Sequence, residues 1–158
     1  MKKIFETVSS IDIEAPPSVV FVAACGVDAP AVFRKRWPLP GIATVSGHVG
    51  PWGAKGQKRI LRLTDKSVVC EELIGFEPEK SFTYRIYGFT GLLKNLADEG
   101  CGEWSVVGDD ESSSLVWRYS LMTTHSWGQM ALTFLIEYLW PGYMRVALRR
   151  LKLSIEAT

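Results

Sequence analysis

Glu71 is a carboxylate inside a run of residues that is otherwise typical of a β-strand. In the run 67–76, Val69, Glu71 and Leu73 share one face because alternate residues of a strand point the same way, and Glu72 falls on the other face. The two apolar neighbours favour the interior for this face. An unpaired carboxylate there would be costly, so we expect it either to have a raised pKa or to meet a cation.

Arg59 is the natural candidate for that cation. It lies in the preceding strand-like run, 56–64, where Leu61 and Leu63 share its face and favour the interior. Three roles are open for a pair formed by Arg59 and Glu71. It could fix the register of two strands, anchor the polar end of an otherwise apolar ligand, or act in catalysis with Glu71 as the base.

Other residues that commonly do chemistry form no recognisable motif. His48 and His125 are isolated, and His125 beside a serine is typical of a helix cap or a surface position. The three cysteines, Cys25, Cys70 and Cys101, form no CxxC pair and have no metal-ligand spacing with the histidines. No Ser-His-Asp or Cys-His arrangement and no glycine-rich phosphate loop is legible. We therefore expect no metal and no cofactor, and the cysteine pattern favours a reducing, cytoplasmic setting.

Aromatic side chains recur on one face of three later strand-like runs. Alternation places Tyr84 and Ile86 inward in the run 81–90, Trp104 inward in 100–108, and Trp117 with Tyr119 inward in 113–122. The stretch 37–53 raises a different question, because it sets Trp37 and Trp52 among prolines and glycines that normally mark exposed turns. Large indoles favour burial.

The remaining elements follow from hydrophobic periodicity and turn residues. We predict a first strand at 4–13, two short helices at Val19–Ala24 and Pro30–Arg36 with Asp28 as the cap of the second, and a further strand at 43–49. Apolar residues at helical spacing run along the C-terminal segment from Met144 through Leu148 and Leu151 to Ile155. Pro141 is expected to kink or break the helical run that begins near Gly128. The order β-α-α-β-β-β-β-β-β-α predicts an α+β fold in which a curved antiparallel sheet of about seven strands wraps around a long C-terminal helix.

Bulk composition narrows the class of protein. At 158 residues the chain is most simply one domain, residues 1–158, with the apolar and charged fractions of a globular protein. The net charge of +1 gives no general attraction to nucleic acid. The most apolar segment, 130–146, is interrupted by charged residues and a proline, so no membrane span is expected. We expect a monomer or a weak homodimer.

The element order and several short motifs together resemble the START-like, or SRPBCC, superfamily. The resemblance covers nearly the whole chain and looks closest to the bacterial polyketide cyclase/dehydrase and lipid-transport branch. The motifs that carry it are Ile11-Asp12-Ile13-Glu14-Ala15-Pro16, Gly50-Pro51-Trp52, Gly56-Gln57-Lys58-Arg59, Glu71-Glu72-Leu73, Pro78, Gly102-Glu103-Trp104, Leu115-Val116-Trp117 and Leu148-Arg149-Arg150-Leu151.

This resemblance implies a helix-grip fold that encloses a deep apolar cavity. In the related abscisic-acid receptors, a glutamate at the position matching Glu71 looks into that cavity. Trp37 and Trp52 would then be either lips of the cavity mouth or plugs at the end of the core. The residues expected to line the cavity are Trp37, Trp52, Arg59, Leu61, Glu71, Leu73, Tyr84, Ile86, Trp104, Trp117, Tyr119, Phe134 and Tyr138.

Three functions are compatible with these expectations. The leading interpretation is the binding or carriage of a small hydrophobic molecule, such as a lipid, polyketide or isoprenoid-like compound, with that molecule as the main partner. The second is a polyketide cyclase or dehydratase that uses the same cavity, with Glu71 and Arg59 as the candidate catalytic residues. The third is a co-chaperone-like interaction module with a filled core.

Overall fold

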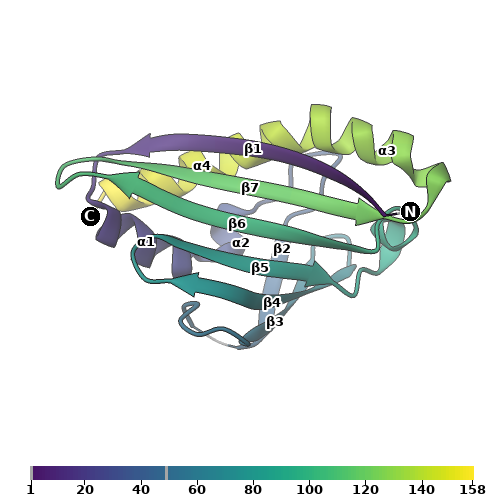
Figure 1. Cartoon of the computed structure of the whole chain (residues 1–158), viewed down its shortest axis with the longest axis horizontal. Coiled ribbons are helices and arrows are strands. Elements are labelled where there is room, and N and C mark those ends of the chain that lie inside the picture. The colour runs from purple at the N-terminus through teal and green to yellow at the C-terminus, as the bar shows by residue number, and fades with distance from the viewer. Residues whose placement is uncertain (1, 49) are drawn as a thin grey trace.

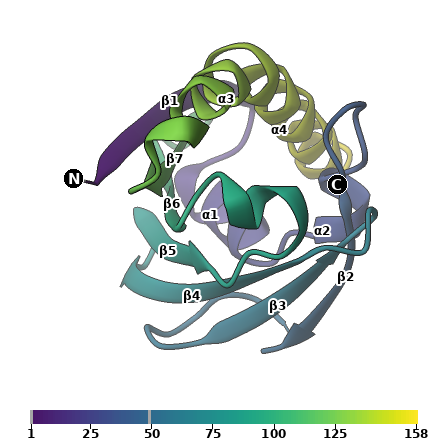
Figure 2. The ribbon, with the colours of Figure 1, turned by 90° about the vertical axis from the view of Figure 1, so that its right-hand side faces the viewer.

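The computed structural model describes residues 2–48 and 50–158. Seven antiparallel strands form one sheet in the order β1-β7-β6-β5-β4-β3-β2. Their bounds are β1 Lys3–Ile13, β2 Ile42–Gly47, β3 Lys58–Leu63, β4 Val68–Glu77, β5 Ser81–Tyr87, β6 Glu99–Gly108 and β7 Ser113–Thr123. The sheet curls around the interior, with its concave face toward the helices (Figure 1, Figure 2).

Helices cover the concave side of the sheet and its ends. They are α1 Pro17–Cys25, α2 Ala29–Val32, the short 3-10 turns η1 Gly91–Asn95 and η2 Ser126–Gly128, α3 Gln129–Phe134, the π-helical turn η3 Leu135–Leu139, and α4 Trp140–Glu156. Helix α4 packs mainly against β1, and the C-terminal end of the chain lies near α1 (Figure 1). The architecture is the predicted helix-grip arrangement.

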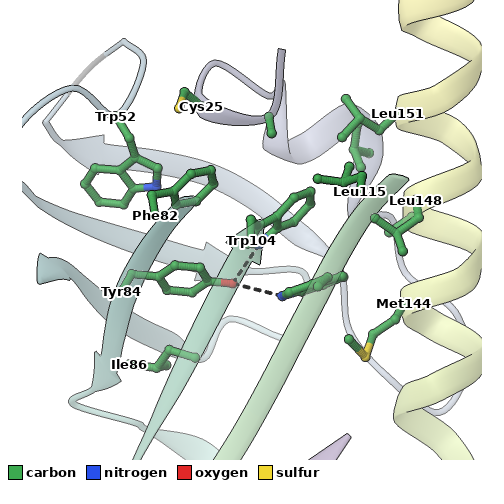
Figure 3. Close-up of a cluster of buried hydrophobic side chains, with 14 of the residues drawn as sticks. Cys25, Trp52, Phe82, Tyr84, Ile86, Trp104, Leu115, Met144, Leu148 and Leu151 are labelled. Atoms are coloured by element: carbon green, nitrogen blue, oxygen red, sulfur yellow. Dashed lines mark hydrogen bonds between the residues drawn. The ribbon is translucent and has the colours of Figure 1, made fainter. Parts of the chain in front are cut away.

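The long C-terminal helix packs through the predicted apolar stripe. Met144, Leu148, Leu151 and Ile155 are all buried, and three of them point toward Leu115 and its neighbours on the sheet (Figure 3). Fully burying one such side chain contributes roughly 1.5–3 kcal/mol. This stripe is therefore a main source of the contact between helix and sheet.

The kink or break predicted at Pro141 is replaced by an irregularity before it, in a helical run that is continuous from Gln129 to Glu156. Pro141 lies in the first turn of α4, where its missing N–H is tolerated, and the irregular backbone is the π-helical turn η3 just before it. The run from α3 through η3 into α4 forms one curved helical path beside β1 (Figure 1).

Several predicted boundaries are wrong; the strand expected at 81–90, for example, ends at Tyr87. The helix expected at Pro30–Arg36 ends at Val32, although Asp28 does cap it by accepting the amide of Ala31. The carbonyl of Phe33 instead accepts the amide of Ile42, which turns the chain back toward β2. The strand expected at 43–49 ends at Gly47, where φ is +85°, and the end of that prediction at Val49 lies outside the described residues.

Candidate functional site

The concave face of the sheet and the helices enclose a cavity of about 450 Å³. This volume falls within the range of about 300–1,000 Å³ that is usual for small-molecule sites. Residues from β3, β4, β5, β6, β7, η1, α3, η3 and α4 line it, and most of them are apolar. The interior is therefore not completely filled by side chains.

The cavity opens between η1 and the α3–η3 segment, and the exposed lining residues Pro38 and Asp65 place two further turns at the opening. Leu92 on η1 and Phe134 on α3 line the cavity and are also exposed to solvent, at 76% and 55%. Residues with both properties mark a mouth. η1 and α3 lie at the same end of the molecule (Figure 2). The apolar segment before Pro141 therefore borders the mouth.

Stacked aromatic rings form one wall of the cavity. Trp104 and Trp117 lie side by side on paired strands with ring centroids 4.9 Å apart, and Phe82 stacks on Trp104 at 6.0 Å. Tyr119 continues the series toward Trp140 of α4, at 4.7 Å. Large apolar rings with a few polar groups give both contact area and orientation to a bound molecule.

Tyr84 places a hydroxyl group in the centre of this wall. Its oxygen accepts hydrogen bonds from the indole Nε1 of Trp104 at 3.3 Å and of Trp117 at 3.2 Å (Figure 3). Its ring lies over Gly102 on the neighbouring strand, and a Cβ at that position would overlap the ring. Glycine at position 102 is therefore what allows the phenol to lie flat against β6.

Glu71 faces the cavity from β4, as alternation predicts. The surrounding protein desolvates its carboxyl group, which raises its pKa from 4.5 to about 7, while the nearby charge of Arg59 acts in the opposite direction. The side chain is nevertheless partly accessible because it borders an open cavity and not a packed core. Desolvation thus favours the protonated form of Glu71 more than that of an exposed glutamate.

The expected ion pair between Arg59 and Glu71 is not formed. The two residues are directly opposite each other on β3 and β4, but the ion pairs among the described residues do not include one between them. The guanidinium of Arg59 instead lies 3.7 Å from the ring of Trp52 and donates to the carbonyl of Gly50 at 2.9 Å. A cation–π contact and a backbone hydrogen bond hold the arginine away from the carboxylate.

Trp52 is a wall of the cavity and not a lip. It is only 5% exposed, its backbone amide donates to the carbonyl of Cys25 at the end of α1, and its ring stacks with His48. These contacts dock its loop against the body of the protein. Of the two alternatives left open by the sequence, this position fits the plug.

Ten of the thirteen expected lining residues border the cavity. They are Trp52, Arg59, Leu61, Glu71, Tyr84, Ile86, Trp104, Trp117, Tyr119 and Phe134. Whether they bind a ligand remains a prediction.

Three residues expected to line the cavity lie elsewhere. Trp37 is 84% exposed, because it occupies the tip of a tight turn that is closed by reciprocal backbone hydrogen bonds between Arg36 and Leu39. Leu73 is fully buried in the packed core and does not reach the cavity. Tyr138 is 69% exposed; it stacks on Phe134 outside, on a side of the π-helical turn that faces solvent.

Several lining residues were not predicted from sequence. Phe33 follows α2 and packs edge-on against Trp117 at 5.5 Å, and Trp140 with Tyr143 contributes aromatic surface from the start of α4. Leu93 lines the cavity from η1, in a segment with no clear periodicity. The adjacent Trp140-Pro141 pair was the one available signal, since proline marks a helix start that could aim an indole inward.

Among the described residues, the histidines and the buried thiol of Cys25 add no reactive group to the cavity. His48 and His125 do not line it; His125 lies 3.4 Å from Asp98 near the surface. Burial raises the pKa of the Cys25 thiol to about 11, so it stays protonated and is a poor nucleophile. Across residues 2–48 and 50–158, no cluster of three or more metal-ligating side chains occurs, and no helix there is long and apolar enough to cross a membrane.

Solved structures with this fold cover nearly the whole chain. An aromatase/cyclase, Zhui from Streptomyces sp. R1128, matches with a TM-score of 0.71 and 14% identity over 98% of this chain and 94% of its own. Ara h 8.0201 matches with a TM-score of 0.66 and 13% identity over 99% and 100%. The protein XoxI from Bacillus cereus matches with a TM-score of 0.66 and 16% identity over 96% of both chains. At these identities the likeness shows the fold alone.

Sequence comparison gives a family. No curated protein is significantly similar to the chain. A family model does match, over residues 5–156, and its description is polyketide cyclase / dehydrase and lipid transport. With the helix-grip fold and the cavity, this match shows that the chain belongs to the polyketide cyclase / dehydrase and lipid transport family of the START-like superfamily.

Proposed function

We propose that this protein binds and carries a small, mainly apolar molecule in the cavity between the sheet and α4. The observation that carries the proposal is an unfilled interior of about 450 Å³ lined mainly by aromatic and aliphatic side chains. Its polar lining consists of Glu71, Arg59, three tyrosines, Asp65, Ser67 and Thr90. An empty apolar space costs stability, because the lining atoms lose packing contacts. A ligand that fills the space recovers those contacts.

The family and the fold support a hydrophobic ligand without identifying it. The family description joins cyclases with lipid transport, so it is compatible with both binding and chemistry. The cavity contains no activated thiol among the described residues. The serine that borders it, Ser67, donates to Asp65 within an exposed turn, where water competes for both groups. These features favour binding over covalent catalysis.

Fluorescence titration with pyrene tests the proposal. Pyrene should bind to the wild-type protein, and Leu61→Trp should abolish or strongly weaken that binding because Leu61 is a buried lining residue on β3. Val107→Trp is the matched control, since Val107 is 72% exposed on β6 and does not line the cavity. Equal pyrene binding by both variants would place the dye outside the cavity and contradict the proposal.

A second candidate is a cyclase or dehydratase that acts on a polyketone chain. It is favoured by one observation: Glu71, with a pKa near 7, and the hydroxyl of Tyr84 face the same cavity. The Glu71 carboxylate would take a proton from a carbon between two carbonyls, and Tyr84 would hydrogen-bond to the enolate oxygen. The enolate carbon would attack a second carbonyl, and the resulting alkoxide would take the proton back from Glu71 to give a hydroxyl group. That hydroxyl and a neighbouring carbon-bound proton would then leave as water.

Glu71→Gln separates the two candidates. If the protein is an enzyme, this variant should lose turnover of a synthetic poly-β-ketone thioester and retain pyrene binding. If the protein is a carrier, the wild type should bind the thioester and leave its rate of cyclisation unchanged. The third function, a module with a filled core, does not fit the unfilled interior of this structure.

A further inference from the structure

The Tyr84 hydroxyl has its accepting positions occupied and its proton free. Its oxygen receives two indole N–H groups, from Trp104 and Trp117 (Figure 3). A phenolic oxygen can also donate one hydrogen bond. Among residues 2–48 and 50–158, no oxygen accepts that proton. The direction left for donation leads into the cavity, which Tyr84 lines.

The position of this donor is fixed on three sides. The two indoles belong to paired residues of β6 and β7, and their rings stack at 4.9 Å, so neither N–H can turn away easily. The phenol ring occupies the space that a Cβ of residue 102 would need, so its close contact with Gly102 limits its movement on that side. Hydrogen bonds that an oxygen accepts also strengthen the one that it donates. Tyr84 is therefore a preorganised donor and not a freely rotating hydroxyl.

The hydroxyl remains a donor at any ordinary pH. Burial and the nearby Glu71 raise the pKa of Tyr84 well above 10, although the two indole hydrogen bonds act in the opposite direction. The proton is thus retained. A single fixed donor is suited to a ligand atom that only accepts.

We propose that Tyr84 donates a hydrogen bond to the carbonyl oxygen of a neutral, otherwise apolar ligand such as a ketone or an ester. A carbonyl needs one donor and supplies none, which matches a hydroxyl whose accepting positions are both occupied and whose proton is free. A ligand carboxylate fits less well, because it would face the acidic Glu71 while the Arg59 guanidinium is held by Trp52 and Gly50. This inference rests on the proposed binding function and specifies the chemistry of its ligand.

Two dyes of the same shape test the proposal. One is 6-propionyl-2-dimethylaminonaphthalene, which carries a ketone, and the other is its analogue with a methylene group in place of the carbonyl. Tyr84→Phe should weaken binding of the ketone dye about threefold to tenfold, the value of one neutral hydrogen bond, and change binding of the methylene dye less than twofold. Tyr119→Phe is the matched control: it removes another cavity hydroxyl, one for which no partner among the described residues fixes the direction.

Infrared spectroscopy of the ketone dye, with ¹³C at its carbonyl carbon, gives a second measurement of the same hydrogen bond. In the wild type, the ¹³C=O stretch should lie at lower frequency than in a hydrocarbon solvent, and Tyr84→Phe should restore the solvent value. If that variant does not fold because two indoles lose their acceptor, the wild-type spectrum alone decides, and an unshifted stretch overturns the proposal.

The dye-binding experiment has other outcomes that separate the role of Tyr84 from the binding function. Equal weakening of both dyes by Tyr84→Phe would mean that the ring only packs against the ligand, and an equal or larger selective effect of Tyr119→Phe would assign the donor to Tyr119. Either result overturns the proposal and leaves the binding function intact. Failure of the methylene dye to bind the wild type would instead overturn the binding function itself.

Discussion

Replacing Glu71 with glutamine tests whether an unpaired carboxyl group in the cavity makes the protein less stable as the pH rises. In the folded protein, desolvation raises the pKa of Glu71 from 4.5 to about 7, with Arg59 opposing this effect from a distance. Between these two pH values the folded state holds a proton that the unfolded state has released. Stability therefore decreases from about pH 4.5 to about pH 7 and is constant, with respect to this group, above that range.

The size of the effect follows from the same two values. They differ by about 2.5, and one pKa unit corresponds to about 1.4 kcal/mol, so ionised Glu71 costs roughly 3 kcal/mol at pH 8. Glutamine is similar in shape and does not titrate. We expect the difference in unfolding free energy between Glu71→Gln and the wild type to rise by about 2–3 kcal/mol between pH 4.5 and pH 8, in favour of the variant.

Urea unfolding at pH 4.5, 6 and 8 measures this difference directly. All other titrating groups are common to both proteins, so their contributions cancel. A Glu72→Gln variant removes a carboxylate from the opposite face of β4 and corrects for the general loss of one negative charge. A difference that stays constant across the three pH values, or that rises toward acid pH, would refute the argument that Glu71 is desolvated without an ion-pair partner.

Three further substitutions test the packing around the cavity. Trp52→Ala should lower the unfolding free energy by about 3–5 kcal/mol, as for large aromatic truncations in cores; a change below about 1 kcal/mol in thermal or urea unfolding would contradict its placement as a wall. Trp37→Ala should change both stability and pyrene affinity little, because the side chain is 84% exposed, so a marked loss of affinity would show that this indole reaches the ligand. Gly102→Ala should destabilise the protein and displace Tyr84 from its two indole partners, since a Cβ there overlaps the phenol ring; unchanged stability together with unchanged near-ultraviolet circular dichroism would disprove that overlap.

The fold was largely predictable because its signals are periodic. Strand-like runs separated by turn residues predicted the seven-stranded antiparallel sheet, and the stripe from Met144 to Ile155 predicted the face of α4 that packs on it. The local exceptions depend on hydrogen bonds between distant residues. The amide of Ile42 bonds to the carbonyl of Phe33, for example, and ends the second helix early.

The cavity wall was predictable where strand alternation determines whether a side chain faces inward. It was not predictable where a long side chain can contact more than one neighbouring residue. Tyr84, Trp104 and Trp117 line the cavity, as the alternation of side chains along their strands predicts. Arg59 also has the predicted register, but its long side chain contacts Trp52 instead of Glu71, and sequence does not encode that choice.

Aromatic residues outside the strands were harder to place. Trp37 at a turn tip and Tyr138 on a π-helical turn point to solvent, whereas Trp140 at the start of α4 lines the cavity. A turn of 36–39 with a two-residue tip leaves little to bury an indole, and a π-helical turn shifts the faces that α-helical periodicity would assign. Local geometry, and not residue type, decides these three positions.

Native mass spectrometry of protein purified without detergent tests the central claim most directly. We expect a fraction of the wild-type protein to carry one additional neutral, apolar compound that is released by gentle activation, and we expect Leu61→Trp to lack that mass while Val107→Trp retains it. A compound bound equally to all three proteins, or apolar molecules that fail to bind the wild type even when added in excess, would contradict a ligand site in the cavity.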